Sequence, residues 1–317
     1  MGVLNRRSFV RATGATCLAN MLHFSDAEDR HNASLPTAHM PRLGVVSKVG
    51  TNETADATIK RVHDLGFSNC QIFFEHLTLD DVNPLLKALS KYGVEVSAVS
   101  EHNPGPRVFN FYEGPLTVGI VPPANPNRRA RIQALKLAAD FARQCNIPSV
   151  HTHLGFIPEN PNDPIYPQAI AAIREVAGYC KEQGRMLLAE TGEDTPITML
   201  RMIQDVGTDN IFVNLDTANL ILCGKGNPVD AMDVFGHLVR GVHAKDGLFP
   251  TDPRNFGREV PIGQGRVDFP ALFKRFKGVN YAGAITIERE IEGPRQTTDI
   301  LQSQLFLQGL ITKTYAE

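Results

Sequence analysis

Four successive apolar runs in the second half of the chain each end in a residue that could bind a metal ion. In chain order these residues are Glu190, Asp216, His243 and Glu288. Carboxylates buried at one place repel one another unless a cation holds them. Three carboxylates and one imidazole suit a single divalent ion; we expect Mn²⁺ first, with Mg²⁺, Co²⁺ or Zn²⁺ as alternatives. A lone residue of this kind would more often cap a helix or form a salt bridge. The prediction therefore depends on all four residues lying at the ends of successive strands.

A second group of polar residues near the same strand ends could contact a substrate. His151 and His153 are two positions apart on an expected strand and therefore face the same way. We expect His153, nearer the strand end, to touch substrate, although one histidine could instead pack in the core. The other candidates are Asn219, Lys245, Asp246 and Arg254. Lys245 could neutralise an oxyanion and Asp246 could orient a ligand, but either could also be a solvated loop charge.

The elements that must position these residues follow one repeating theme from residue 42 onward. Short apolar runs, typical of buried parallel strands, alternate with amphipathic helical stretches. The expected strands cover residues 43–49, 69–74, 94–99, 149–153, 186–190, 211–216, 241–243 and 284–288. The expected helices cover residues 54–65, 80–92, 128–144, 167–183, 196–206, 228–238, 268–276 and 297–314. Eight strand–helix units in a row predict an α/β fold, a (β/α)8 TIM barrel forming a single domain over residues 41–317.

An open doubly wound sheet is the alternative architecture. Such a sheet usually carries a Gly-rich turn after its first strand. Here the sequence reads Val-Gly-Thr-Asn at residues 49–52, without a GxGxxG motif. In a TIM barrel, chemistry takes place at the carboxyl ends of the strands, which is where the four candidate ligands fall.

Two long segments between the expected elements could shape a pocket. Residues 247–265, after the seventh strand, are rich in Pro and Gly and contain Arg254. A long loop in a compact barrel is usually functional, and this one could close over a substrate. Residues 103–127, after the third strand, contain Phe109, Phe111 and Tyr112, which could wall a pocket against the C–H faces of a sugar. A surface loop with its own small apolar cluster is the alternative for this second segment.

The first 40 residues differ in character from the rest. Arg6 and Arg7 are followed by Phe9 and by a mildly apolar stretch that runs to Phe24. This order resembles a twin-arginine export signal, and the polar residues 25–40 predict a linker. We therefore expect export to the periplasm by the twin-arginine route, with a cytoplasmic location as the alternative if the signal is not functional.

Composition excludes several classes of protein. The 317 residues are 42% hydrophobic and 21% charged, which is ordinary for a globular protein. The net charge of −2 gives no bulk attraction to nucleic acid. Five cysteines without a CxxC pair argue against a disulfide scaffold and a thiolate zinc site. No apolar run reaches the roughly 18 residues that span a bilayer, so we expect a small-molecule partner rather than nucleic acid or a membrane.

The strand-end motifs resemble those of the xylose isomerase-like TIM-barrel superfamily, and more closely its sugar phosphate isomerase/epimerase branch. The motifs are HTHLGF at 151–156, LAETG at 188–192, NLDTANL at 214–220, GVHAKD at 241–246 and TIERE at 286–290. The resemblance covers about residues 42–315. It implies that the four candidate ligands hold one divalent metal, and that Glu190 and Glu288 exchange protons with a sugar from opposite faces. Related barrels often form dimers or tetramers, so a homo-oligomer is compatible with the resemblance.

The implied reaction is metal-dependent isomerisation or epimerisation of a keto-sugar or a related polyol. The cation would stabilise an enediolate as a Lewis acid, while two carboxylates remove and return a proton. If the enediolate instead expelled a β-hydroxyl, the same site would be a dehydratase or lyase of a keto-sugar or inosose, which is the main alternative.

One departure from the family pattern bears on the substrate. Many ketose 3-epimerases carry His three residues after the sixth-strand Asp, whereas this chain has Asn219. Asn can bond a sugar hydroxyl but cannot shuttle protons near neutral pH. The same departure, with Asp-Pro-Arg at 252–254 in place of a further Asp-x-His, argues against an abasic-site endonuclease with three zinc ions. A sugar-binding accessory protein with a relict site is a further alternative, which the presence of all four ligands disfavours.

Overall fold

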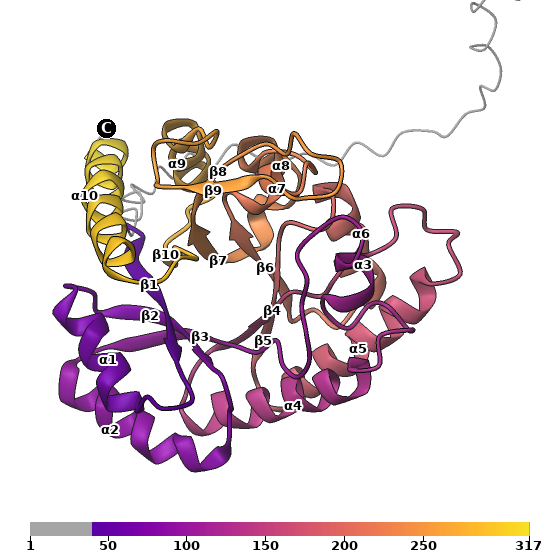
Figure 1. Ribbon diagram of the computed structural model, residues 1–317, viewed down its shortest axis with the longest axis horizontal. Coiled ribbons are helices and arrows are strands. Elements are labelled where there is room, and N and C mark those ends of the chain that lie inside the picture. Colours follow the sequence, from indigo (N-terminus) through magenta and orange to yellow (C-terminus); the bar gives the residue numbers. More distant parts are fainter. Residues whose placement is uncertain (1–39, 317) are drawn as a thin grey trace, which may run out of the picture. The chain divides into compact units, whose positions relative to one another are not determined.

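Eight parallel strands close into a barrel in the computed structural model, which describes residues 40–316 (Figure 1). Around the barrel the strands follow the order β1-β10-β7-β6-β5-β4-β3-β2. Their bounds are β1 Arg42–Val49, β2 Asn69–Phe74, β3 Glu95–Ser100, β4 Ser149–Thr152, β5 Met186–Glu190, β6 Ile211–Asp216, β7 Val239–Ala244 and β10 Ala284–Ile287. The predicted closed barrel is confirmed, and an open sheet is excluded. The expected export signal lies outside the described residues.

Helices that follow the barrel strands pack around the outside of the ring (Figure 1). The long ones are α1 Ala55–Asp64, α2 Val82–Tyr92, α4 Arg128–Gln144, α5 Tyr166–Glu182, α6 Pro196–Val206, α8 Pro228–Phe235, α9 Phe269–Gly278 and α10 Pro294–Ala316. Side chains of Thr54, Asn227 and Asp268 accept backbone N–H groups in the first turns of α1, α8 and α9. Such caps satisfy donors that a helix start leaves free. No helix within residues 40–316 combines the length and apolar character needed to cross a membrane.

Several short elements complete the chain. The helices α3 Gly114–Thr117 and α7 Asn219–Leu222 were not predicted, whereas the 3-10 turns η1 Leu79–Asp81 and η2 Gly236–Leu238 fall at the ends of the helices expected over 80–92 and 228–238. The strands β8 Asp246–Leu248 and β9 Arg258–Val260 form an antiparallel pair inside the 247–265 segment. That segment was expected to be a long loop, and the structure shows that it contains this short hairpin.

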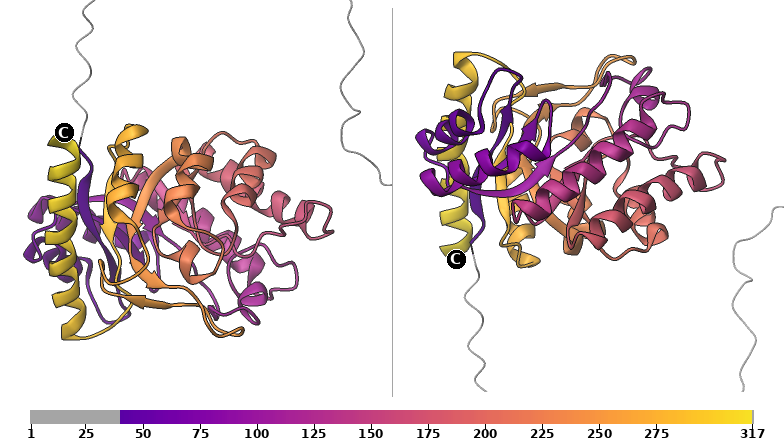
Figure 2. Two further views of the ribbon diagram at one scale, coloured as in Figure 1. Left: turned by 90° about the horizontal axis from the view of Figure 1, so that it is seen from above. Right: turned by 90° about the horizontal axis from the view of Figure 1, so that it is seen from below.

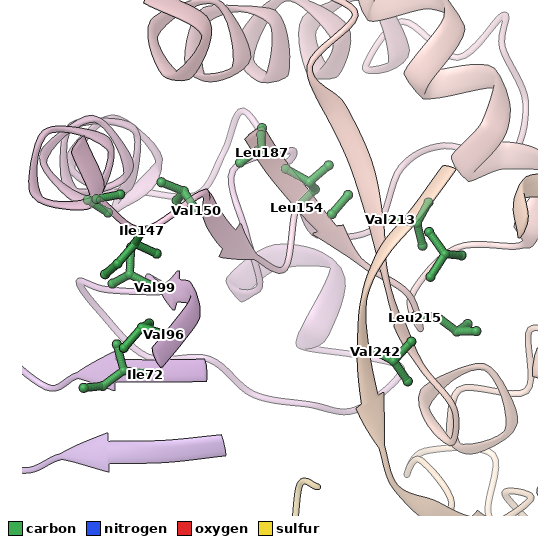
Figure 3. Packing of buried hydrophobic residues seen from close by; sticks show 14 of the residues in the cluster. Ile72, Val96, Val99, Ile147, Val150, Leu154, Leu187, Val213, Leu215 and Val242 are labelled. Carbon is green, nitrogen blue, oxygen red and sulfur yellow. The ribbon is translucent and has the colours of Figure 1, made fainter. Parts of the chain in front are cut away.

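The apolar core lies between the barrel and its helices. Successive side chains on a strand point to opposite faces, so each buried apolar residue alternates with one that faces into the barrel. Val150, Leu215 and Val242 belong to the core that packs on the helices, and Figure 3 shows them with neighbours from β2 to β7. Full burial of each such side chain contributes about 1.5–3 kcal/mol to folding. The residue after each of the three is polar and faces the barrel interior, so core packing sets the direction of the polar side chains.

Two segments meet at the end of the barrel where the strands finish. The chain around Asn110 pairs with Asn255 in an isolated antiparallel bridge, which links the 103–127 segment to the β8–β9 hairpin. Phe111 also packs edge to face on Phe256, with ring centroids 4.9 Å apart. Figure 2 shows both segments at the same end of the molecule, at the bottom of the left panel and the top of the right panel. Together they cover one side of the strand ends.

Threonine side chains tie neighbouring strand ends together. The Thr191 hydroxyl donates to the carbonyl of Asp216 at 3.1 Å and accepts the Asp216 N–H at 3.0 Å. The Thr217 hydroxyl does the same with Lys245, at 2.6 Å and 3.0 Å. These bonds continue the strand pairing β5–β6–β7 beyond the sheet and hold three consecutive strand ends in register.

Candidate active site

Four side chains from consecutive strand ends converge at the mouth of the barrel. Glu190 ends β5, Asp216 ends β6, His243 lies on β7 and Glu288 directly follows β10. Each offers one ligand atom, and these atoms all lie within 4.8 Å of one another. Three of the residues are buried and the Glu288 side chain is 15% exposed. The structure therefore brings together the four candidate ligands expected from the sequence.

Asp216 has one carboxylate oxygen that the protein leaves without a hydrogen bond. Its Oδ1 accepts the N–H groups of Ala218 and Asn219 at 2.7 Å and 2.8 Å, which fixes the side chain at the start of α7. Its Oδ2 is buried and has no hydrogen-bond partner within residues 40–316. The nearest cation is Lys245, whose Nζ lies 3.7 Å away. A buried, unpartnered carboxylate oxygen beside two more carboxylates and an imidazole fits the donor set of a divalent cation.

Glu190 lies among three imidazoles. Its Oε2 lies 2.7 Å from Nε2 of His151 and 3.1 Å from Nε2 of His153, and its Oε1 lies 3.2 Å from Nδ1 of His243. The His151 contact is close but lacks hydrogen-bond alignment, since this nitrogen has no hydrogen-bond partner within residues 40–316. Burial alone would raise the pKa of Glu190, but the three imidazoles hold it well below its usual range. Glu190 is therefore a carboxylate when it meets a ligand.

Glu288 forms an ion pair with the buried side chain of Lys245. Its Oε2 lies 3.1 Å from Nζ of Lys245 and 3.5 Å from Nδ1 of His243, while Lys245 also reaches Glu290 at 2.7 Å. Burial would raise the pKa of Glu288, but Lys245 and His243 hold it well below its usual range. The other carboxylate oxygen of Glu288 makes no hydrogen bond within the described residues. It is the carboxylate oxygen in the cluster best placed to meet a substrate.

A hydrogen-bonded chain across the barrel orients His243. Gln71 on β2 donates from Nε2 to Oδ1 of Asn214 on β6 at 2.9 Å, and its Oε1 lies 2.8 Å from Nε2 of His243. Strands β2 and β6 are not neighbours, so this chain passes through the barrel interior. Gly241 makes room for it, because a Cβ there would lie 2.2 Å from Oδ1 of Asn214. Because Nε2 of His243 donates to Oε1 of Gln71, the Nδ1 atom of His243 faces Glu190 and Glu288 and is available as a ligand.

We expect Gln71→Leu to weaken metal binding roughly tenfold to a hundredfold, because loss of an acceptor behind a ligating histidine has effects of this size. The measurement is a titration of the metal-free protein with Mn²⁺. Cys70→Ala is the matched control, since Cys70 is buried on the opposite face of the same strand and should cost stability without changing affinity. An unchanged affinity in Gln71→Leu would show that His243 needs no orienting partner.

A cavity of about 720 Å³ opens onto this cluster and is large enough for a sugar. Its walls include five of the residues predicted from the sequence, namely His151, His153, Glu190, His243 and Glu288. They also include three residues that were not predicted, namely Phe73, His102 and Arg107, together with Phe109 from the 103–127 segment. Of the three aromatic residues expected to wall a pocket, Phe109 does so. Phe111 and Tyr112 instead pack against the hairpin side of the site, on Phe256 and Arg254.

His153 is held between two buried carboxylates. Its Nδ1 lies 2.9 Å from Glu193 and its Nε2 lies 3.1 Å from Glu190. Burial would lower the pKa of His153, but the two carboxylates raise it to about 9. The neighbouring His102 has the opposite tendency: burial, His153 and His151 hold its pKa well below the usual value. The wall beside Glu190 therefore pairs a cationic imidazole with a neutral one.

The remaining predicted residues lie outside the cavity wall. Asn219 donates to Oε1 of Glu190 at 3.2 Å, and Lys245 contacts the carboxylates behind the cluster. Asp246 accepts the N–H groups of Gly263, Gly265 and other backbone amides, so it fastens the segment that follows β9. Arg254 lies over the Tyr112 ring, 4.7 Å from its centroid. The structure thus joins Asn219 and Lys245 to the cluster and does not bring Asp246 or Arg254 to it.

Sequence reasoning missed Gln71, His102, Arg107 and Glu193. His102 lies just after β3, so the rule that strand ends carry function could have found it. Glu193 follows Glu190 in the same loop, where a second acidic residue carries no signal by itself. Gln71 is in the middle of a strand and Arg107 is in a loop, and no local pattern distinguishes either one.

A closed parallel barrel with ligand-type side chains at the carboxyl ends of four consecutive strands defines a TIM-barrel protein with a candidate metal centre at its mouth. The chain belongs to the xylose isomerase-like TIM barrel family, whose model matches residues 59–310. This confirms the resemblance drawn from the strand-end motifs.

Relatives and solved structures agree with this membership. The chain is 22% identical over 284 residues to an uncharacterized protein of Methanocaldococcus jannaschii, covering 83% of this chain and 89% of that protein. It is 24% identical over 260 residues to the L-ribulose 3-epimerase of Mesorhizobium japonicum, covering 78% and 81%. The structure of a xylose isomerase domain protein from Planctomyces limnophilus matches with a TM-score of 0.80 and 26% identity, covering 87% of this chain and 100% of that one.

Proposed function

We propose that this protein is a divalent-metal-dependent isomerase or epimerase of a keto-sugar, which moves a proton at the carbon beside the carbonyl. The observation that carries the proposal is the pair of carboxylates in one cavity. Glu190 and Glu288 both line it, and they come from strands β5 and β10, which are separated by β6 and β7. Two carboxylates that reach a substrate from different directions can remove a proton on one side and return it on the other.

The residues suited to hold the metal are Glu190, Asp216, His243 and Glu288. A divalent cation bound there would supply Lewis-acid stabilisation of negative charge on a carbonyl oxygen and its neighbouring hydroxyl. The protein's own groups have separate tasks. Lys245 holds the Glu288 carboxylate in its ionised form, and the imidazoles around Glu190 do the same for that residue. Each carboxylate is therefore ready to accept a proton.

The shape of the cavity also supports a sugar as the substrate. The cavity wall also carries the rings of Phe73 and Phe109, which suit the C–H face of a sugar, while His102 and His153 offer polar contacts to hydroxyls. The similarity to an L-ribulose 3-epimerase supports the same substrate class. Asn219 bonds Glu190 rather than facing the cavity, so hydroxyl recognition falls to the histidine wall.

The proposal predicts that the metal-loaded protein catalyses uptake of solvent deuterium at the carbon next to the carbonyl of a keto-sugar. The measurement is NMR of D-fructose, D-tagatose and L-ribulose, with their uronates and phosphate esters, incubated in deuterated buffer with the protein. Chelated protein is the control and should leave the signals unchanged. Release of water with formation of an unsaturated or deoxy product would instead indicate the dehydratase. No uptake across the panel would refute the proposed chemistry.

A further inference from the structure

One cation in the cavity wall has no ionic partner among the residues that the structure describes. Four long basic side chains line the cavity: Lys48, Arg61, Arg107 and Arg289. Lys48 pairs with Glu75 at 3.3 Å, Arg61 pairs with Glu53, and Arg289 pairs with Glu259 at 2.9 Å and Asp299 at 2.8 Å. The guanidinium of Arg107 makes neither an ion pair nor a hydrogen bond with any group of residues 40–316. The guanidinium lies near the Phe73 ring, with its Cζ atom 5.8 Å from the ring centroid.

An arginine in this position normally finds a partner. Arg107 is half-buried, and burial lowers its pKa from the ordinary value, although a guanidinium stays protonated. Arg107 lines the cavity, and its guanidinium has no acceptor within residues 40–316, so its N–H donors are available to a group that enters the cavity. Glu101, Glu290 and Glu190 add to the field around the guanidinium but do not pair with it.

The backbone holds Arg107 in place independently of any partner. Arg131 is almost fully buried and donates to the carbonyls of Pro104 and Pro106, both at 2.9 Å. On the other side, Val108 donates its N–H to the hydroxyl of Thr117 at 3.1 Å. The residues before and after Arg107 are therefore anchored, so the guanidinium is presented from a fixed turn rather than from a loose loop.

The surroundings of Arg107 suit the end of a sugar that does not react. The same cavity is lined by Glu190, His243 and Glu288 of the candidate metal cluster and also by Arg107, Phe73 and Phe109. A molecule that reaches both would place its carbonyl at the cluster and its far end at the arginine. A guanidinium binds a carboxylate or a phosphate with two parallel hydrogen bonds, which a neutral hydroxyl cannot accept.

We propose that Arg107 binds an anionic group at the far end of the substrate, so that the substrate is an acidic keto-sugar: a sugar acid or a sugar phosphate. The inference rests on the proposed keto-sugar chemistry and adds the charge of the substrate to it. Arg107 is a binding residue in this scheme and takes no part in proton transfer.

The test compares three ketoses that differ at the terminal carbon: D-fructose, its terminal phosphate ester and the corresponding uronate. Dissociation constants are measured by calorimetry with the Mn²⁺-loaded full-length protein. We expect at least one anionic ligand to bind about tenfold to a hundredfold more tightly than D-fructose, the range of a charge-assisted hydrogen-bonded pair. Preference for the phosphate or for the uronate identifies which anion the site accepts.

Variants assign the preference to Arg107. Arg107→Met should abolish the advantage of the anion and leave the D-fructose affinity within about twofold of the original, whereas Arg107→Lys should retain part of it. Arg61→Met is the matched control, because Arg61 lines the same cavity but is already paired, and it should keep the preference. Three results would each overturn the proposal. They are an original protein without anion preference, an anion preference that survives in Arg107→Met, and a loss of D-fructose affinity in Arg107→Met as large as the loss of anion affinity.

Deuterium uptake in the same samples separates this inference from the proposed function. Deuterium uptake without anion preference would support the proposed isomerase or epimerase activity and refute the inference that the substrate is acidic. Anion preference at Arg107 without any uptake would leave an anion-binding cavity and refute the proton-transfer chemistry.

Discussion

Substituting Asp216 with Ala should leave the folded protein without stoichiometric metal, whereas the original protein should hold about one divalent ion per chain. Asp216 supplies a buried oxygen that has no hydrogen-bond partner within residues 40–316, and its loss removes both a candidate ligand and a negative charge from the cluster. Elemental analysis after loading with Mn²⁺ and removal of excess ion measures the effect. We expect the affinity to fall by a factor of about a hundred or more, since a lost ligand costs at least as much as a lost supporting contact.

Asp194→Ala provides the matched control for Asp216→Ala. Asp194 is also a fully buried carboxylate at the end of the barrel, and it accepts the N–H of Ile157 at 2.7 Å, but it is not part of the cluster. Its substitution should lower stability and leave the metal content unchanged. No metal in the original protein under any loading condition would contradict the assignment, and about three zinc ions would favour the endonuclease alternative.

Glu190→Gln and Glu288→Gln should each reduce deuterium exchange about a hundredfold to ten-thousandfold, the usual contribution of a positioned acid or base. Gln keeps the size of the side chain and one oxygen atom that can bind a metal ion, so folding and some metal binding should survive. Exchange into the keto-sugar is measured under metal saturation, which removes any effect of weakened affinity. Glu292→Gln serves as the control, because Glu292 follows the same strand end as Glu288 but lies outside the cluster.

The pattern of losses in these two variants distinguishes the chemistry. Loss of exchange in both variants supports two carboxylates that act on opposite sides of the substrate. Loss in one variant with retention in the other would indicate a single base that moves a proton between neighbouring carbons, as in an aldose–ketose isomerase. Full activity in both would refute the assignment of proton transfer to these carboxylates.

Much of the barrel and of its candidate site could be predicted from the sequence, because both follow local rules. A parallel strand buried on both faces must be apolar throughout, so each strand is visible as a short run that ends in polar residues. The end of β6 is an example: Leu215 packs in the core, and the next residue, Asp216, must face the barrel interior. The convergence of four ligands then follows from closure of the barrel.

The parts that could not be predicted depend on contacts between distant residues. Gln71 and Asn214 are 143 positions apart, and nothing in either strand indicates a hydrogen bond across the interior. Asp246 was expected to face a ligand, but the chain that returns after β9 brings Gly263 and Gly265 to its carboxylate. The β8–β9 hairpin was missed because its strands have three residues each and lie among Pro and Gly. Whether Arg107 is paired depends on the position of every carboxylate around the cavity.

The threonine bonds between strand ends affect how such a barrel can diverge during evolution. Thr191 and Thr217 fix the spacing of the ligand-bearing strands through bonds that belong to the barrel itself. Arg107 and Phe109, which line the cavity, lie instead on the segment between β3 and β4. Mutations in that segment can reshape the cavity without moving the four candidate ligands at the strand ends. A duplicated gene for this barrel can therefore acquire a new ligand preference through changes in a single connecting segment while the strand-end cluster is preserved.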